Sequence, residues 1–75
     1  MNKTMYFAFC ENKLSFISFN PLYDLYCDCN VYQIKYNSNI IFELIQCMYD
    51  NNDENYFMYV LNQNNVKYKY KYYGM

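Results

Sequence analysis

A chain of 75 residues is long enough for one small domain and too short for a second hydrophobic core, so we expect residues 1–75 to fold as a single globular domain. The formal net charge is −1, which excludes a strong overall attraction to nucleic acid or to anionic membranes. Aromatic residues make up 24% of the chain, with 12 tyrosines and 6 phenylalanines. The composition therefore predicts an unusually large aromatic surface that has to be covered.

The composition is also biased toward amino acids with A/T-rich codons. Asn (12), Tyr (12), Lys (6), Phe (6) and Ile (5) account for more than half of the chain, while Arg, His and Trp are absent. We infer that the source is AT-rich, such as a phage, a virus, a mobile element or a low-GC bacterium.

No targeting or membrane segment is evident. The first apolar run ends at Glu11 after six residues, too few for a secretory signal, and no stretch approaches the roughly 18 apolar residues of a membrane span. We therefore expect a cytoplasmic protein that does not contact membranes, with its four cysteines as reduced thiols.

Residues 4–20 predict a β-hairpin, because two runs rich in aromatic and aliphatic residues flank a polar turn at residues 11–13. Both faces of the first run are apolar, which is typical of a strand that is buried on both sides. Asn20 and Pro21 end the second strand, since proline lacks the N–H group that a strand ladder needs.

Residues 22–37 predict a second hairpin with its turn near residues 28–30. The alternation is clearest after the turn, where Tyr32, Ile34 and Tyr36 share one face and Val31, Gln33 and Lys35 share the other. A helix over residues 22–29 is the alternative for the first half.

Residues 39–50 predict an amphipathic helix. Its apolar residues recur at helical spacing, at Ile40, Ile41, Leu44, Ile45 and Met48. Ser38 or Asn39 can cap its first turn, because their side-chain oxygens accept hydrogen bonds from free backbone N–H groups. The acidic, Asn-rich residues 50–55 end the helix.

Residues 56–73 predict a third hairpin that turns at residues 63–65, where asparagine tolerates left-handed backbone. In its last strand one face carries Val66, Tyr68, Tyr70 and Tyr72, and the other carries Lys67, Lys69, Lys71 and then Tyr73. We expect the first face to turn toward the core, while the lysines protect an exposed strand from pairing with other chains.

The predicted order is β-β-β-β-α-β-β, an α+β fold. It consists of an antiparallel sheet of five to six strands built from hairpins, with a single helix packed on one face. One helix cannot cover both faces of such a sheet, although several predicted strands are apolar on both sides, including residues 56–61. The sheet therefore either curls into a partial barrel or has its second face covered by another molecule.

Catalytic and metal-binding motifs are absent from the sequence. Cys27 and Cys29 are close, but Cys10 and Cys47 are isolated, unlike the paired ligands of structural zinc sites. Residues 50–61 lack the glycine and the final carboxylate of a calcium loop. Without histidine, and with Gly74 as the only glycine, the chain offers neither a general base near neutral pH nor a phosphate loop. We expect no enzyme activity, no metal and no cofactor.

The aromatic surplus favours binding over catalysis, because tyrosine is enriched where proteins meet. Our leading hypothesis is a small non-enzymatic protein-interaction module that occupies the surface of a host or target protein. A phage, viral or mobile-element inhibitor of host defence, such as an anti-CRISPR-like factor, belongs to this class. The candidate interaction surface comprises Lys67, Lys69, Lys71, Tyr73, Tyr56 and Tyr59.

Two alternatives stay open. The C-terminal Lys/Tyr hairpin could bind single-stranded nucleic acid, since lysines neutralise phosphates and tyrosines stack on bases. Alternation weakens this hypothesis, because it places Lys67, Lys69 and Lys71 opposite most of the tyrosines. The second alternative is a homodimer that encloses a small ligand as a sponge or scaffold.

Overall fold

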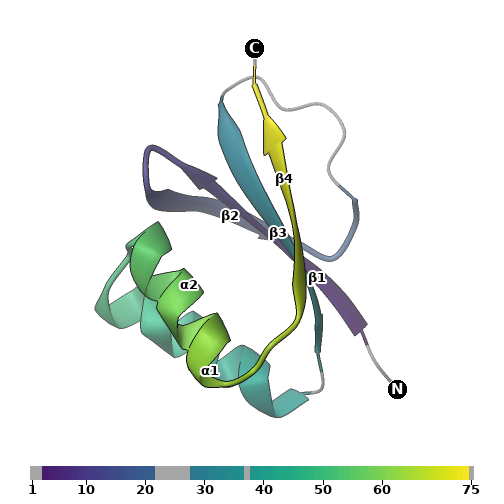
Figure 1. The fold of residues 1–75 in the computed structure, drawn as a ribbon, viewed down its shortest axis with the longest axis vertical. Coiled ribbons are helices and arrows are strands. Elements are labelled where there is room, and N and C mark those ends of the chain that lie inside the picture. The colour runs from purple at the N-terminus through teal and green to yellow at the C-terminus, as the bar shows by residue number, and fades with distance from the viewer. Residues whose placement is uncertain (1–2, 22–27, 37, 75) are drawn as a thin grey trace.

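The computed structural model describes residues 3–21, 28–36 and 38–74. Within them it contains the strands β1 (Lys3–Cys10), β2 (Lys13–Ser18) and β3 (Cys29–Tyr36), the helices α1 (Ser38–Asp50) and α2 (Glu54–Gln63), and the strand β4 (Tyr68–Tyr73). The strands form one antiparallel sheet in the order β2-β1-β3-β4. Both helices lie on one side of this sheet (Figure 1). The protein is therefore α+β, as the sequence predicts.

The first hairpin is confirmed. Cys10 pairs with Lys13, and the two residues between them, Glu11 and Asn12, have φ angles of 50° and 68°. Positive φ at both central positions suits the right-handed twist of a tight hairpin. The carbonyl of Asn12 accepts a hydrogen bond from the backbone N–H of Glu54 (3.0 Å), so the hairpin turn is tied to the start of α2.

The predicted turn at residues 28–30 is wrong. Cys29 and Asn30 already belong to β3, where they lie opposite Tyr73 and Tyr72 of β4. Because β3 pairs with β1 on one side and with β4 on the other, its backbone stays extended through these residues. The strand or helix expected over residues 22–27 lies outside the described residues.

The helix predicted over residues 39–50 is confirmed as α1. Leu44, Cys47 and Met48 are buried against the sheet and α2, at the spacing of successive helical turns. Ile45, which the pattern places on the apolar face, is instead 38% exposed.

Residues 56–61 form part of α2, so the third hairpin and the expectation of a single helix are wrong. Asp53 caps this helix, because its side-chain oxygen accepts from the backbone N–H groups of Asn55 (2.8 Å) and Tyr56 (3.3 Å). Phe57 and Leu61, one turn apart, are fully buried. A short apolar run is compatible with the period of a strand and with that of a helix. Here the Asp53 cap and the burial of Phe57 and Leu61 favour the helix. The sheet consequently has four described strands instead of five to six, and the order is β-β-β-α-α-β.

The predicted turn at residues 63–65 does contain an asparagine with left-handed backbone, but this residue follows a helix and does not join two strands. Asn65 has a φ of 53°, and the side-chain amide of the preceding Asn64 donates to the carbonyl of Val60 (2.9 Å). These residues end α2 and lead the chain back to β4.

The main core lies between the sheet and the two helices. The ring of Phe57 lies 4.9 Å from those of both Phe7 and Phe9, measured between centroids. The opposite face of the sheet carries a smaller cluster of Ala8, Cys29 and Val31. The described strands form an open sheet, with β2 and β4 at its edges, and do not close into the partial barrel that we considered. None of the described helices is long and apolar enough to cross a membrane.

Cys10 and Cys29 form a disulfide bond, with 4.8 Å between their Cα atoms. They follow the pair Phe9 and Asn30 in the β1–β3 register, so antiparallel pairing brings them face to face. The expectation of reduced thiols is therefore wrong for this pair. Cys47 is a buried free thiol, as expected, and Cys27 lies outside the described residues.

Candidate functional site

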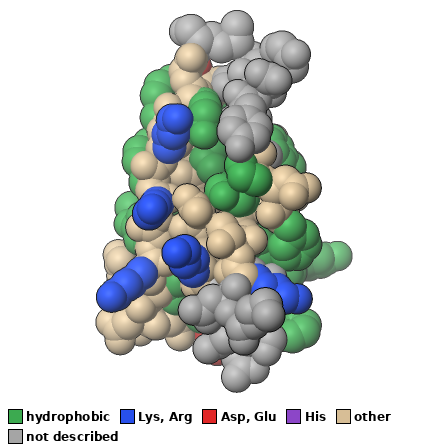
Figure 2. Space-filling model, turned by 90° about the vertical axis from the view of Figure 1, so that its right-hand side faces the viewer, with side chains coloured by type: hydrophobic (Ala, Val, Ile, Leu, Met, Phe, Trp, Pro, Cys, Tyr) green, Lys and Arg blue, Asp and Glu red, His purple; other side chains and the backbone are tan. Residues whose placement is uncertain are grey.

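The open face of the sheet collects most of the lysines. Lys69 and Lys71 of β4 lie opposite Gln33 and Val31 of β3, so their side chains point away from the helices. Figure 2 shows the lysine side chains spread along this side of the molecule. We call the exposed group the lysine face, and it consists of Lys35, Lys67, Lys69 and Lys71.

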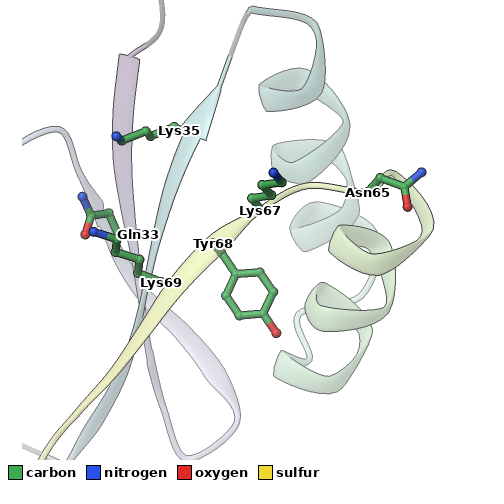
Figure 3. Close-up of a pocket in the computed structure, with 6 residues that line it drawn as sticks. All are labelled: Gln33, Lys35, Asn65, Lys67, Tyr68 and Lys69. Atoms are coloured by element: carbon green, nitrogen blue, oxygen red, sulfur yellow. The ribbon is translucent and has the colours of Figure 1, made fainter.

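A pocket of about 540 Å³ lies within the lysine face. Its lining comprises Gln33, Lys35, Asn65, Lys67, Tyr68 and Lys69 (Figure 3). In the close-up, Lys69 and Gln33 point away from the helices, whereas the ring of Tyr68 points toward them. Three ammonium groups and two amides, with no carboxylate among the described lining residues, form a surface suited to an anionic group.

A second, smaller pocket adds aromatic rings to the same face. It has a volume of about 220 Å³ and is lined by Tyr6, Val31, Gln33, Lys69, Tyr70, Lys71 and Tyr73. The ammonium of Lys71 lies 4.9 Å from the centroid of the Tyr73 ring, a cation–π contact. Tyr6 and Tyr73 thus share a face with the lysines.

Tyr6 and Lys35 were not among the candidate residues of the sequence analysis. Tyr6 belongs to β1, and only the sheet order places it near β4, across β3. The alternation of Lys35 with Ile34 and Tyr36 does put it on the polar face of its strand, but pairing of β3 with β4 is needed to place it beside Lys67 and Lys69.

Four of the six described acidic residues belong to the helical layer, and the other two, Glu11 and Asp28, lie outside it. Glu43 and Asp50 are exposed on α1, while Asp53 and Glu54 stand at the start of α2. The net charge of −1 is therefore the sum of opposite charges on two surfaces, a positive sheet face and a negative helical layer. Each layer attracts partners of opposite charge.

The remaining candidate residues, Tyr56 and Tyr59, lie on α2 and not on the lysine face. Their rings are stacked, with 6.1 Å between centroids and an interplanar angle of 15°. Phe42 and Tyr49 of α1 are also exposed in this layer. The structure therefore separates the six candidates, with Lys67, Lys69, Lys71 and Tyr73 on one face and the two helical tyrosines elsewhere.

A hydrogen-bonded network joins α2 to the sheet. The Glu54 carboxylate accepts hydrogen bonds from the Asn30 side-chain amide (3.0 and 3.2 Å) and from the Tyr32 hydroxyl (2.5 Å). The hydroxyl of Tyr70 donates to Oδ1 of Asn30 (2.5 Å). Burial, followed by the neighbouring Glu54, raises the pKa of Tyr32 far above its ordinary value, so Tyr32 stays a donor. The sequence gives no sign of this network, because Glu54 stands in the acidic, Asn-rich stretch that is expected to end the first helix, and Asn30 stands in a predicted turn.

Among the described residues, no three His, Cys, Asp or Glu side chains come together in a group that could hold a metal ion. Comparisons with protein-family models, curated proteins and solved structures gave no match.

Proposed function

We propose that this protein is a small non-enzymatic interaction module that docks an acidic surface of a target protein on its lysine face. The observation that carries the proposal is charge segregation: four of the six lysines gather on one face, and no described carboxylate lines its pockets. Complementary charge increases the rate of association and disfavours partners of the wrong charge.

The module works by covering part of its target, since exposed lysines are solvated, charged ammonium groups that are suited to binding an acidic surface. With the AT-rich composition, this supports an inhibitor from a phage, a virus or a mobile element that acts on a host protein, including a defence protein. We place its action in the cytoplasm of the producing or host cell. In that compartment glutathione and thioredoxin act against the disulfide between Cys10 and Cys29, so the proposal requires a fold that tolerates loss of this bond.

Single-stranded nucleic acid is the second candidate partner, and it is favoured by the rings of Tyr6 and Tyr73 on the lysine face. Two observations rank it lower. Both rings are half-buried, and Lys71 already covers part of Tyr73. The acidic helical layer also repels any polyanion that extends beyond the lysine face.

Charge reversal of single lysines tests the proposal. Lys69→Glu reverses a charge on the lysine face, and Lys3→Glu is the matched control, an exposed lysine that lines neither pocket of that face. Tagged wild-type protein and both variants are incubated with lysate of candidate host cells, and stoichiometric partners are identified by mass spectrometry. We expect a protein partner that binds the wild type and Lys3→Glu, is lost with Lys69→Glu, and dissociates as salt increases.

The same variants distinguish the alternatives. Binding of an oligothymidylate with a steep salt dependence, in the absence of any protein partner, would establish the nucleic-acid function instead. A stable dimer in analytical ultracentrifugation that persists with Lys69→Glu would favour the homodimeric sponge or scaffold. A protein partner retained by Lys69→Glu would show that the lysine face is not the docking surface.

A further inference from the structure

A pocket of about 420 Å³ lies on the opposite side of the sheet from the lysine face, and its volume is typical of small-ligand sites. Strands β3 and β4 and helix α2 contribute its walls. We call it the tyrosine pocket, and it is lined by Tyr32, Glu54, Met58, Tyr68 and Tyr70. The ring of Tyr68 points toward the helices in Figure 3, on the side away from Lys69.

Three aromatic rings in the tyrosine pocket are tilted against one another. Tyr32 lies 5.5 Å from Tyr68 with an interplanar angle of 56°, and 5.4 Å from Tyr70 with an angle of 63°. At these separations the rings are in contact, and Tyr32, which is 1% exposed, supports the other two from behind. Tyr68 and Tyr70 are the rings that a ligand can reach, and their faces are electron-rich. Such faces attract cations, most strongly where water is excluded. Met58 adds a polarizable thioether.

The Glu54 carboxylate adds a negative charge to this aromatic wall. Glu54 is only 8% exposed, and its observed hydrogen-bond partners, Asn30 and Tyr32, are both neutral. No lysine is found among the described residues that line the pocket. The positive end of the α2 dipole offsets part of the burial cost, and a bound cation would supply the opposite charge that the described neighbours lack.

We infer that the tyrosine pocket binds an alkylated ammonium cation, such as a choline-like headgroup or a methylated lysine side chain. A quaternary ammonium fits better than a primary ammonium, because Asn30 and Tyr32 already occupy most acceptor positions of the carboxylate. An N-methylated cation donates no hydrogen bonds and binds through ring faces and charge. A metal ion is disfavoured, since no second carboxylate, thiolate or imidazole lines the pocket among the described residues.

This inference does not rest on the proposed docking function. Tyr68 and Tyr70 line the tyrosine pocket and also line pockets of the lysine face, so substitutions of these two residues do not separate the hypotheses. Lys69 lines both pockets of the lysine face and does not line the tyrosine pocket. The Lys69→Glu variant should bind the ammonium cation like the wild type, which keeps the two hypotheses separable.

Methyl NMR tests the inference directly. The protein is labelled with ¹³C at the methionine methyl groups, the Met58 signal is assigned with Met58→Leu, and choline or tetramethylammonium chloride is titrated in at constant ionic strength. We expect a saturable shift of the Met58 methyl signal. Ethanolamine, a primary ammonium, and 3,3-dimethylbutan-1-ol, the neutral isostere of choline, should bind about tenfold more weakly or not at all.

Matched variants locate the site. Tyr70 and Tyr72 are both on β4 and both 54% exposed, but only Tyr70 lines the tyrosine pocket. Tyr70→Ala should weaken binding of choline by about tenfold, whereas Tyr72→Ala should leave it unchanged. Glu54→Gln should weaken binding in the same way, and its far-UV circular dichroism checks that α2 is intact.

A peptide that contains trimethyllysine separates the two sources of the cation. Tighter binding of the peptide than of free choline would indicate a methylated protein, and equal binding would indicate a small molecule. The inference is overturned if neither compound gives a saturable shift, if the neutral isostere binds as well as choline, or if Tyr72→Ala weakens binding as much as Tyr70→Ala.

Discussion

The hydroxyl of Tyr32 donates a hydrogen bond to the carboxylate of Glu54, with 2.5 Å between the oxygens. Tyr32 stands in the middle of β3, and Glu54 is the first residue of α2, so this bond connects the sheet to the helix that covers it. Because both side chains are buried, the carboxylate depends on its protein donors in place of water.

Removal of this donor should destabilise the protein. In Tyr32→Phe the Glu54 carboxylate keeps only the Asn30 amide as an observed donor. We expect the free energy of unfolding to fall by on the order of 1–3 kcal/mol, the cost of a buried polar group that loses its partner. Urea denaturation at neutral pH measures the difference. Tyr49→Phe, at an 88% exposed position of α1, is the control and should unfold like the wild type.

Alkaline pH should reveal the same contact. The pKa of Tyr32 in the folded protein is raised above the ordinary value of 10.0, so the unfolded chain releases this proton first. The stabilising contribution is therefore complete below pH 10.0 and declines as the pH rises further. The wild type should lose stability faster than Tyr32→Phe in this range, which urea denaturation at increasing pH tests. Parallel curves would contradict the assignment.

The capping role of Asp53 predicts an acid-sensitive helix. Hydrogen bonds from backbone N–H groups, chiefly that of Tyr56, lower the pKa of Asp53 below its ordinary 3.8. Its contribution is present above that value and is lost as the pH falls through the lowered pKa. Asp53→Ala should reduce the melting temperature at neutral pH, whereas Asp53→Asn, which retains a capping oxygen, should lose less. Thermal circular dichroism of both variants at neutral and acidic pH provides the measurement.

Two phenylalanines on neighbouring helices should respond very differently to truncation. Phe57 of α2 is 0% exposed and contacts the rings of Phe7 and Phe9, while Phe42 of α1 is 75% exposed. Phe57→Ala should cost about 3–5 kcal/mol of stability because it leaves a cavity. Phe42→Ala should stay within about 0.5 kcal/mol of the wild type. Similar losses in chemical denaturation would mean that α2 does not cover the sheet in this way.

The disulfide between Cys10 and Cys29 should stabilise the protein only under oxidising conditions. Its partners are 19 residues apart in sequence, and closure of a loop of this size contributes about 3 kcal/mol. In a Cys27→Ser background, adding Cys10→Ser should lower the stability by about that amount without reductant and by much less with it. An equal effect of Cys10→Ser with and without reductant would argue against the disulfide bond.

Cys47 should react slowly with alkylating reagents both with and without reductant, because burial and then the neighbouring Asp50 raise the pKa of its thiol.

The elements that could be predicted from the sequence are those with one dominant local pattern. The turn at Glu11 and Asn12 follows two apolar runs, and α1 has a clear helical period. The alternation of lysine and tyrosine in β4 likewise predicts its two faces. Residues 56–61 fit both a strand and a helix, and the outcome depends on the Asp53 cap and on the burial of Phe57 and Leu61. That burial requires the sheet to be in place.

The sequence by itself determined the α+β class, the first hairpin, α1 and the two-faced character of β4, because neighbouring residues specify turns and periods through local sterics and burial. Only the tertiary structure decided that Tyr6 and Lys35 join the lysines of β4, that Cys10 meets Cys29, and that Glu54 meets Tyr32. These contacts depend on the strand order β2-β1-β3-β4 and on packing between segments that are far apart in the chain. Period and propensity carry no information about which distant strands become neighbours.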